Sequence, residues 1–147
     1  MAEEFLRTIE TSIGISTSPK RIWDVLAQFD AYPVWNPFIT SIVGVPREGT
    51  KLRVRINPPG RSGMTFKPTI LAATHQQNLT WLSHLFLPGV FDGEHRFQIE
   101  DHGKTCRFFQ SERFSGLLVP LFGAGMFDAI RRGFEAINAA LKKRAEV

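Results

Sequence analysis

His95 is a polar residue at a position where the sequence pattern calls for an apolar one. Between Phe91 and Glu100, small or apolar residues alternate with charged or polar ones, and His95 falls on the apolar side. This alternation is typical of a half-buried strand. Burying a polar group without a partner costs free energy. The imidazole therefore needs a hydrogen-bond partner or a cavity, and a cavity would let it meet a ligand.

The next predicted strand supplies two candidate partners for His95. If the turn between the strands is centred on residues 102–103, then His95 faces Gln110, and Glu112 lies diagonally on the same face. Directly opposed Cβ atoms lie about 5 Å apart and diagonal ones about 7–8 Å. We therefore expect His95 to bond Gln110 and to reach Glu112 diagonally or through water. A similar count brings Trp81 beside His95.

Three interpretations of this polar cluster stay open. Histidine changes charge near neutral pH, so His95 is the candidate general acid or base. Apolar walls with a few converging polar groups are also the usual composition of a small-molecule pocket. Alternatively, the polar trio satisfies its own hydrogen bonds and only fixes the strand register. Glu94 and His95 point to opposite strand faces, and no metal site is predicted.

The strands that must position these residues alternate with clear turn signals. Thr17-Ser18-Pro19 marks a helix start. Apolar residues at three- to four-residue spacing from Met126 to Leu141 predict one long amphipathic helix at the end of the chain. Short connections favour an antiparallel sheet whose concave face holds that helix. The predicted strands cover residues 8–16, 38–45, 50–56, 64–75, 78–85, 90–100 and 104–114.

Composition indicates one ordinary globular domain over residues 1–147. The chain is 43% hydrophobic and 22% charged, and its 13 Phe and 3 Trp suit a wide core or the walls of an apolar pocket. The net charge of +4 comes without a nucleic-acid motif, so we expect a solvated basic surface and no nucleic-acid partner. No nucleophile elbow, phosphate loop or dinucleotide fingerprint is present, and no cofactor is predicted.

The chain also lacks the signals of secretion and membrane insertion. Cys106 is the single cysteine, which excludes an internal disulfide. The acidic first residues lack the apolar core of a signal peptide. The longest apolar stretch, residues 117–127, contains Pro120 and two glycines and is too short to span a bilayer. We expect a cytoplasmic protein without stable membrane insertion, and the sequence does not predict its oligomeric state.

Three segments together resemble the SRPBCC superfamily, which includes START and birch-pollen-allergen-like domains, and within it the bacterial polyketide cyclase/dehydrase-like branch. They are Tyr32-Pro33-x-Trp35-Asn36-Pro37-Phe38, Gly93-Glu94-His95-x-Phe97 and the run from Glu112 to Leu118. The resemblance implies an α+β helix-grip fold: a curved seven-stranded antiparallel sheet wrapped around a long C-terminal helix, with two short helices after the first strand. It also implies an apolar cavity between sheet and helix.

The resemblance and the strand faces together suggest which residues meet a ligand. The loop at 57–63 is expected to flank the cavity mouth. The predicted ligand-binding residues are Phe66, Ile70, Trp81, His95, Phe97, Phe108, Gln110, Glu112, Phe122, Met126 and Ile130.

Three functions follow as hypotheses. The first is binding, transport or sensing of a hydrophobic small molecule, such as a lipid, polyketide or aromatic compound, in the cavity. The second is a polyketide cyclase or dehydratase that uses His95 as acid or base. The third is a protein-interaction module like the co-chaperone relatives of this superfamily. Fold alone does not decide between them, and the sequence leaves open whether the protein is an enzyme.

Overall fold

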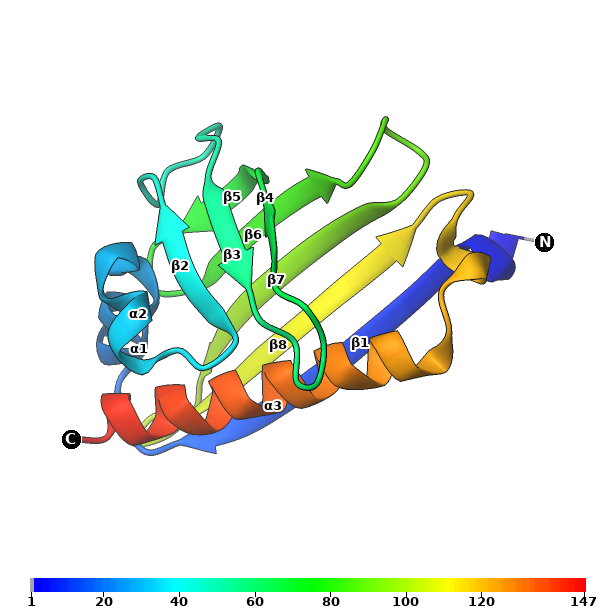
Figure 1. Cartoon of the computed structure of the whole chain (residues 1–147). Helices are drawn as coiled ribbons and strands as arrows, with labels where there is room; N and C mark the ends of the chain where they lie inside the picture. The colour runs from blue at the N-terminus through cyan, green and yellow to red at the C-terminus, as the bar shows by residue number, and fades with distance from the viewer. Residues whose placement is uncertain (1) are drawn as a thin grey trace.

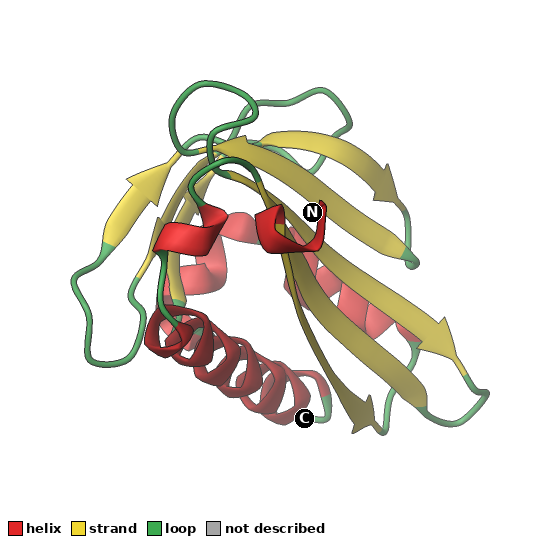
Figure 2. Ribbon diagram, turned by 90° about the vertical axis from the view of Figure 1, so that its right-hand side faces the viewer, coloured by secondary structure: helices red, strands yellow, loops and turns green. Residues whose placement is uncertain are grey.

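The computed structural model describes residues 2–147, which form two antiparallel sheets gripping a long helix (Figures 1 and 2). A five-stranded sheet has the order β1-β8-β7-β6-β5, and a three-stranded sheet has the order β2-β3-β4. The strands are β1 (Leu6–Ile15), β2 (Ile39–Val43), β3 (Arg53–Ile56), β4 (Met64–Phe66), β5 (Thr69–Thr74), β6 (Asn78–His84), β7 (Asp92–Asp101) and β8 (Cys106–Ser115). The helices are η1 (Ala2–Phe5), α1 (Pro19–Ala27), η2 (Phe29–Ala31), α2 (Tyr32–Trp35), η3 (Val119–Leu121) and α3 (Ala124–Ala145).

The helix-grip architecture expected from the sequence is confirmed, but the strands differ from the single seven-stranded sheet that was predicted. There are eight strands in two sheets within residues 2–147. The predicted strand over 64–75 is divided into β4 and β5 around Pro68, which has no N–H to donate. The two sheets stay joined beside this break, because Leu52 N donates to Pro68 O at 2.7 Å and Ile70 N donates to Thr50 O at 2.9 Å.

The long helix α3 packs its apolar stripe toward the sheets. Ile130, Phe134, Ile137 and Leu141 are buried on this stripe, as their spacing predicts, whereas Met126 is only partly buried and its neighbour Phe127 is buried. Gly133 lies directly against the Phe38 ring, and a Cβ at residue 133 would overlap that ring. No helix within residues 2–147 is both long enough and apolar enough to cross a membrane.

The hairpin between β7 and β8 turns one residue later than predicted. His102 N donates to Thr105 O at 2.9 Å, so the turn is centred on Gly103 and Lys104, and Gly103 adopts φ 89°. Glycine at the first central position is typical of tight hairpin turns with positive φ.

The later turn moves the pairing by two residues. His95 is therefore paired with Glu112 rather than Gln110, and Gln110 is paired with Phe97. A shift of two keeps every side chain on its predicted face, whereas a shift of one would have reversed them all.

Candidate functional site

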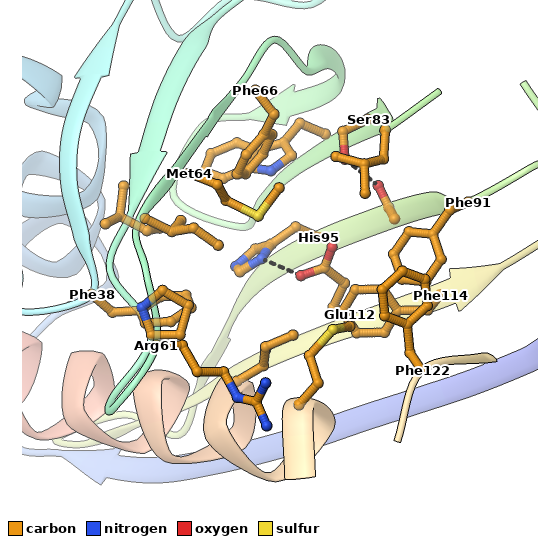
Figure 3. Close-up of a pocket in the computed structure, with 18 of the residues that line it drawn as sticks. Phe38, Arg61, Met64, Phe66, Ser83, Phe91, His95, Glu112, Phe114 and Phe122 are labelled. Carbon is orange, nitrogen blue, oxygen red and sulfur yellow. Dashed lines mark hydrogen bonds and ion pairs between the residues drawn. The ribbon is translucent and has the colours of Figure 1, made fainter. Parts of the chain in front are cut away.

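A cavity of about 260 Å³ lies between the five-stranded sheet, the three-stranded sheet and the first half of α3 (Figure 3). Strand residues form its back, and residues of the β3–β4 loop and of α3 form its other side. Of the predicted ligand-binding residues, those in its wall are Phe66, Trp81, His95, Glu112, Phe122, Met126 and Ile130.

The other four predicted residues do not line the cavity. Ile70, Phe97 and Phe108 are buried, and the Phe97 and Phe108 rings stack with centroids 5.9 Å apart. Gln110 is fully buried and is bonded to α3 instead. Their inward direction was predicted correctly from the alternation. The alternation could not show where along each strand the helix fills the space.

Sequence reasoning also missed part of the wall. Gly93 and Phe114 lie two residues from His95 and Glu112 on the same strand faces, so the alternation already contained the signal for them. The loop expected to flank the mouth does contribute, through three of its residues. The lining residues not predicted individually are Phe38, Ile39, Ile56, Pro58, Arg61, Ser62, Met64, Ser83, Leu85, Phe91, Gly93 and Phe114.

His95 is held by hydrogen bonds at both ring nitrogens. Nδ1 lies 3.3 Å from Glu112 Oε1, and Nε2 lies 3.2 Å from Gln110 Oε1. Gln110 in turn donates through Nε2 to Phe134 O at 3.3 Å and to Asn138 Oδ1 at 2.8 Å. The predicted polar trio therefore forms, with Asn138 of α3 as a fourth member that strand counting could not find.

The same bonds determine where protons lie around the ring. Because the Gln110 amide nitrogen must face the Phe134 carbonyl, its oxygen faces His95, and Nε2 of the imidazole must donate. Nδ1 and Glu112 Oε1 then share one proton, since two lone pairs would repel at this distance. The pair is an imidazolium with a carboxylate, or a neutral imidazole with a carboxylic acid. Either arrangement is electrically neutral as a whole.

Aromatic rings fix the plane of the imidazole. The Trp81 ring stacks on it with centroids 5.0 Å apart and an interplanar angle of 25°. Phe134 approaches at 4.9 Å and 73°, edge to face. The expected neighbour Trp81 is directly paired with His95 across β6 and β7. His95 is thus locked in place, and the group that it holds toward the cavity is Glu112.

Two groups whose pKa is raised by burial, Tyr32 and Cys106, lie outside the cavity wall. Burial raises the pKa of Tyr32 far above its usual range, and its hydroxyl donates to Leu26 O at 2.7 Å. Burial, and then the nearby Asp101 carboxylate, raise the pKa of Cys106, which disfavours the thiolate. Neither residue lines the cavity.

Comparison with known families agrees with the fold. A sequence model described as polyketide cyclase/dehydrase and lipid transport matches residues 7–146. The chain belongs to this family. The resemblance to the SRPBCC superfamily is therefore confirmed for this family member over residues 7–146, which is nearly the whole chain. No protein of curated function matches its sequence.

Solved structures similar to this family member share its fold at low identity. A START superfamily protein from Mycobacterium smegmatis is 21% identical with a TM-score of 0.75, over 95% of this chain and 97% of that one. The aromatase/cyclase Zhui from Streptomyces sp. R1128 is 16% identical with a TM-score of 0.73, over 96% and 94%. The di-domain aromatase/cyclase BexL, of the BE-7585A biosynthetic pathway, is 16% identical with a TM-score of 0.77, over 98% of this chain and 51% of BexL.

Proposed function

We propose that this protein is a carrier or sensor that binds a hydrophobic molecule of one or two rings in the cavity beside α3. The cavity itself carries the proposal, because its wall is largely aromatic and aliphatic and contains few polar groups. Its volume of about 260 Å³ lies just below the roughly 300–1,000 Å³ of pockets for drug-sized ligands. The family description and the aromatase/cyclase neighbours also support a hydrophobic ligand.

Naphthalene tests this function because it has two rings and no polar group. We expect the purified protein to bind naphthalene in equilibrium dialysis. Met126→Trp should weaken that binding at least tenfold, because Met126 lies in the cavity wall and the indole fills the space. Leu121→Trp is the matched control, since Leu121 is exposed and outside the wall. Equal binding by both variants would contradict a ligand site in this cavity.

The proton shared by His95 and Glu112 favours a second candidate function, acid–base catalysis on the bound molecule. A cyclase or dehydratase must remove a proton beside a carbonyl and deliver one to a leaving hydroxyl, which departs as water. The pair holds one proton at the cavity wall. It can accept the proton removed from beside the carbonyl and supply a proton to the leaving hydroxyl. His95 and Glu112 would act together, with Gln110 fixing the ring through Nε2.

Dehydration of an aromatic β-hydroxyketone to the conjugated enone tests this second function. We expect Glu112→Gln to lower the rate about a hundredfold, the usual scale of a general acid–base contribution. Enone formation that is equally fast with Glu112→Gln would exclude the pair from catalysis and leave ligand binding as the function.

A further inference from the structure

Glu112 has one carboxyl oxygen that is not bonded to the protein. Its Oε1 is taken by His95, while within residues 2–147 no donor lies at hydrogen-bond distance from Oε2. The side chain is 15% exposed and belongs to the cavity wall. Figure 3 shows the carboxylate extending from β8 between the His95 ring and the Phe91, Phe114 and Phe122 group. The free oxygen is therefore available only to solvent or to a molecule in the cavity.

The backbone opposite Glu112 is shaped around this oxygen. Gly93 also lines the cavity, and a Cβ at residue 93 would overlap Glu112 Oε2. The lack of a side chain at this position leaves room for the carboxylate beside β7. Gly93 has no positive φ, so its backbone does not require glycine. Space for the carboxylate is what the glycine supplies.

Glu112 Oε2 is a hydrogen-bond acceptor whichever partner holds the shared proton. If His95 carries it on Nδ1, both Glu112 oxygens belong to a carboxylate. If Glu112 carries it on Oε1 and donates to Nδ1, then Oε2 is the carbonyl oxygen of the acid. Neither arrangement gives Oε2 a proton. In either resting arrangement this part of the wall therefore accepts from a bound ligand, and it can donate only after it has taken a proton from one.

We propose that Glu112 Oε2 selects ligands that carry a hydroxyl or another neutral hydrogen-bond donor on an otherwise hydrophobic frame. This inference rests on the proposed binding function and names its ligand class as phenols and alcohols, in preference to ethers and hydrocarbons of the same shape. A ligand carboxylate is disfavoured here, because it would set one acceptor against another. Leaving a buried acceptor without a donor costs free energy, and that cost is what discriminates between ligands.

Three two-ring probes separate the effect of a hydrogen-bond donor on affinity from the effects of size and hydrophobicity. They are 2-naphthol, which donates, 2-methoxynaphthalene, which only accepts, and naphthalene, which does neither. We expect equilibrium dialysis to show 2-naphthol binding about tenfold more tightly than either of the others, equivalent to about 1.4 kcal/mol. This comparison needs only the unmodified protein.

Two substitutions then locate the preference at the carboxyl group. Glu112→Gln keeps an acceptor oxygen and should retain most of the preference for 2-naphthol. Glu112→Met removes the acceptor and should abolish it. Gly93→Ala should weaken it, because the added methyl group displaces the end of a flexible side chain while the fold remains.

The outcomes distinguish this inference from the function on which it rests. Equal affinity for the three probes, or a preference that survives Glu112→Met, would overturn the role of Glu112 Oε2 while leaving hydrophobic binding intact. If none of the probes binds, the proposed binding function itself fails, and the inference fails with it.

Discussion

Phe134→Ala is expected to lower the free energy of unfolding by about 3–5 kcal/mol, the range for deleting a buried phenylalanine ring. Phe134 is 1% exposed in the centre of α3. Its ring meets the Phe38 ring at 5.8 Å and the His95 ring at 4.9 Å, both edge to face. Alanine would leave a hole between the helix and both sheets. Urea denaturation monitored by circular dichroism measures the change through the transition midpoint at constant slope.

A phenylalanine on the β6–β7 loop, Phe86, serves as the exposed control for Phe134. Phe86 is 57% exposed, so Phe86→Ala should change the free energy of unfolding by no more than about 0.5 kcal/mol. If Phe134→Ala were as mild as Phe86→Ala, the gripped position of α3 between the sheets would be wrong. The cavity would then have lost one of its walls.

The elements that could be predicted from the sequence are those with a long or regular pattern. The stripe from Met126 to Leu141 predicted α3, and Ser18 with Pro19 predicted α1, where the Ser18 side chain accepts from Arg21 N. The alternation around His95 predicted the faces of β7 correctly. These features depend on local spacing, which does not change with the rest of the fold.

Features that depend on distant packing could not be predicted in the same way. The number of strands was wrong because Pro68 interrupts one predicted strand, and the pairing of His95 was wrong because the turn is centred one residue later. Asn138 was missed because nothing in its spacing on α3 indicates a partner on β8. The cluster itself was found, since a register error of two residues leaves the same side chains on one face.

The site therefore differs from the sequence-based expectation mainly in the positions of Gln110 and Glu112 relative to His95. Gln110 was expected to be the direct partner and Glu112 the distant one. In the structure Gln110 lies behind His95, away from the cavity, and Glu112 lies in the wall. The imidazole connects a residue that α3 holds rigidly with a carboxyl group that a ligand can reach. The imidazole therefore fixes the position of Glu112.

His95→Leu is expected to lower the free energy of unfolding by about 2–4 kcal/mol, although it places an apolar residue on an apolar face. The replacement leaves Gln110 Oε1 without its donor and Glu112 Oε1 without its partner. An unsatisfied buried group such as Gln110 Oε1 costs roughly 1–3 kcal/mol, and the partly buried Glu112 carboxyl group adds to this cost. The loss of the Trp81 stack adds to this cost. Thermal and urea unfolding at neutral pH measure the change.

A double-mutant cycle separates the His95–Glu112 bond from these other losses. The orphaned Gln110 oxygen is present in His95→Leu and in His95→Leu/Glu112→Leu, so its cost cancels. We expect the pair to be coupled by about 1.5–3 kcal/mol, the range for bonds that involve a charged group. The double variant should therefore be more stable than the sum of the single changes predicts.

The exposed pair of Glu100 and His102 provides the control for this cycle. It joins the same two residue types at 2.5 Å, but its side chains are 51% and 49% exposed, so water screens the interaction. Coupling there should be below about 1 kcal/mol. If the His95–Glu112 coupling is no larger than that of the exposed pair, the two groups do not share a proton across a partly buried bond. Acid–base chemistry by the pair would then lose its physical basis, whereas binding to the apolar wall would not depend on the result.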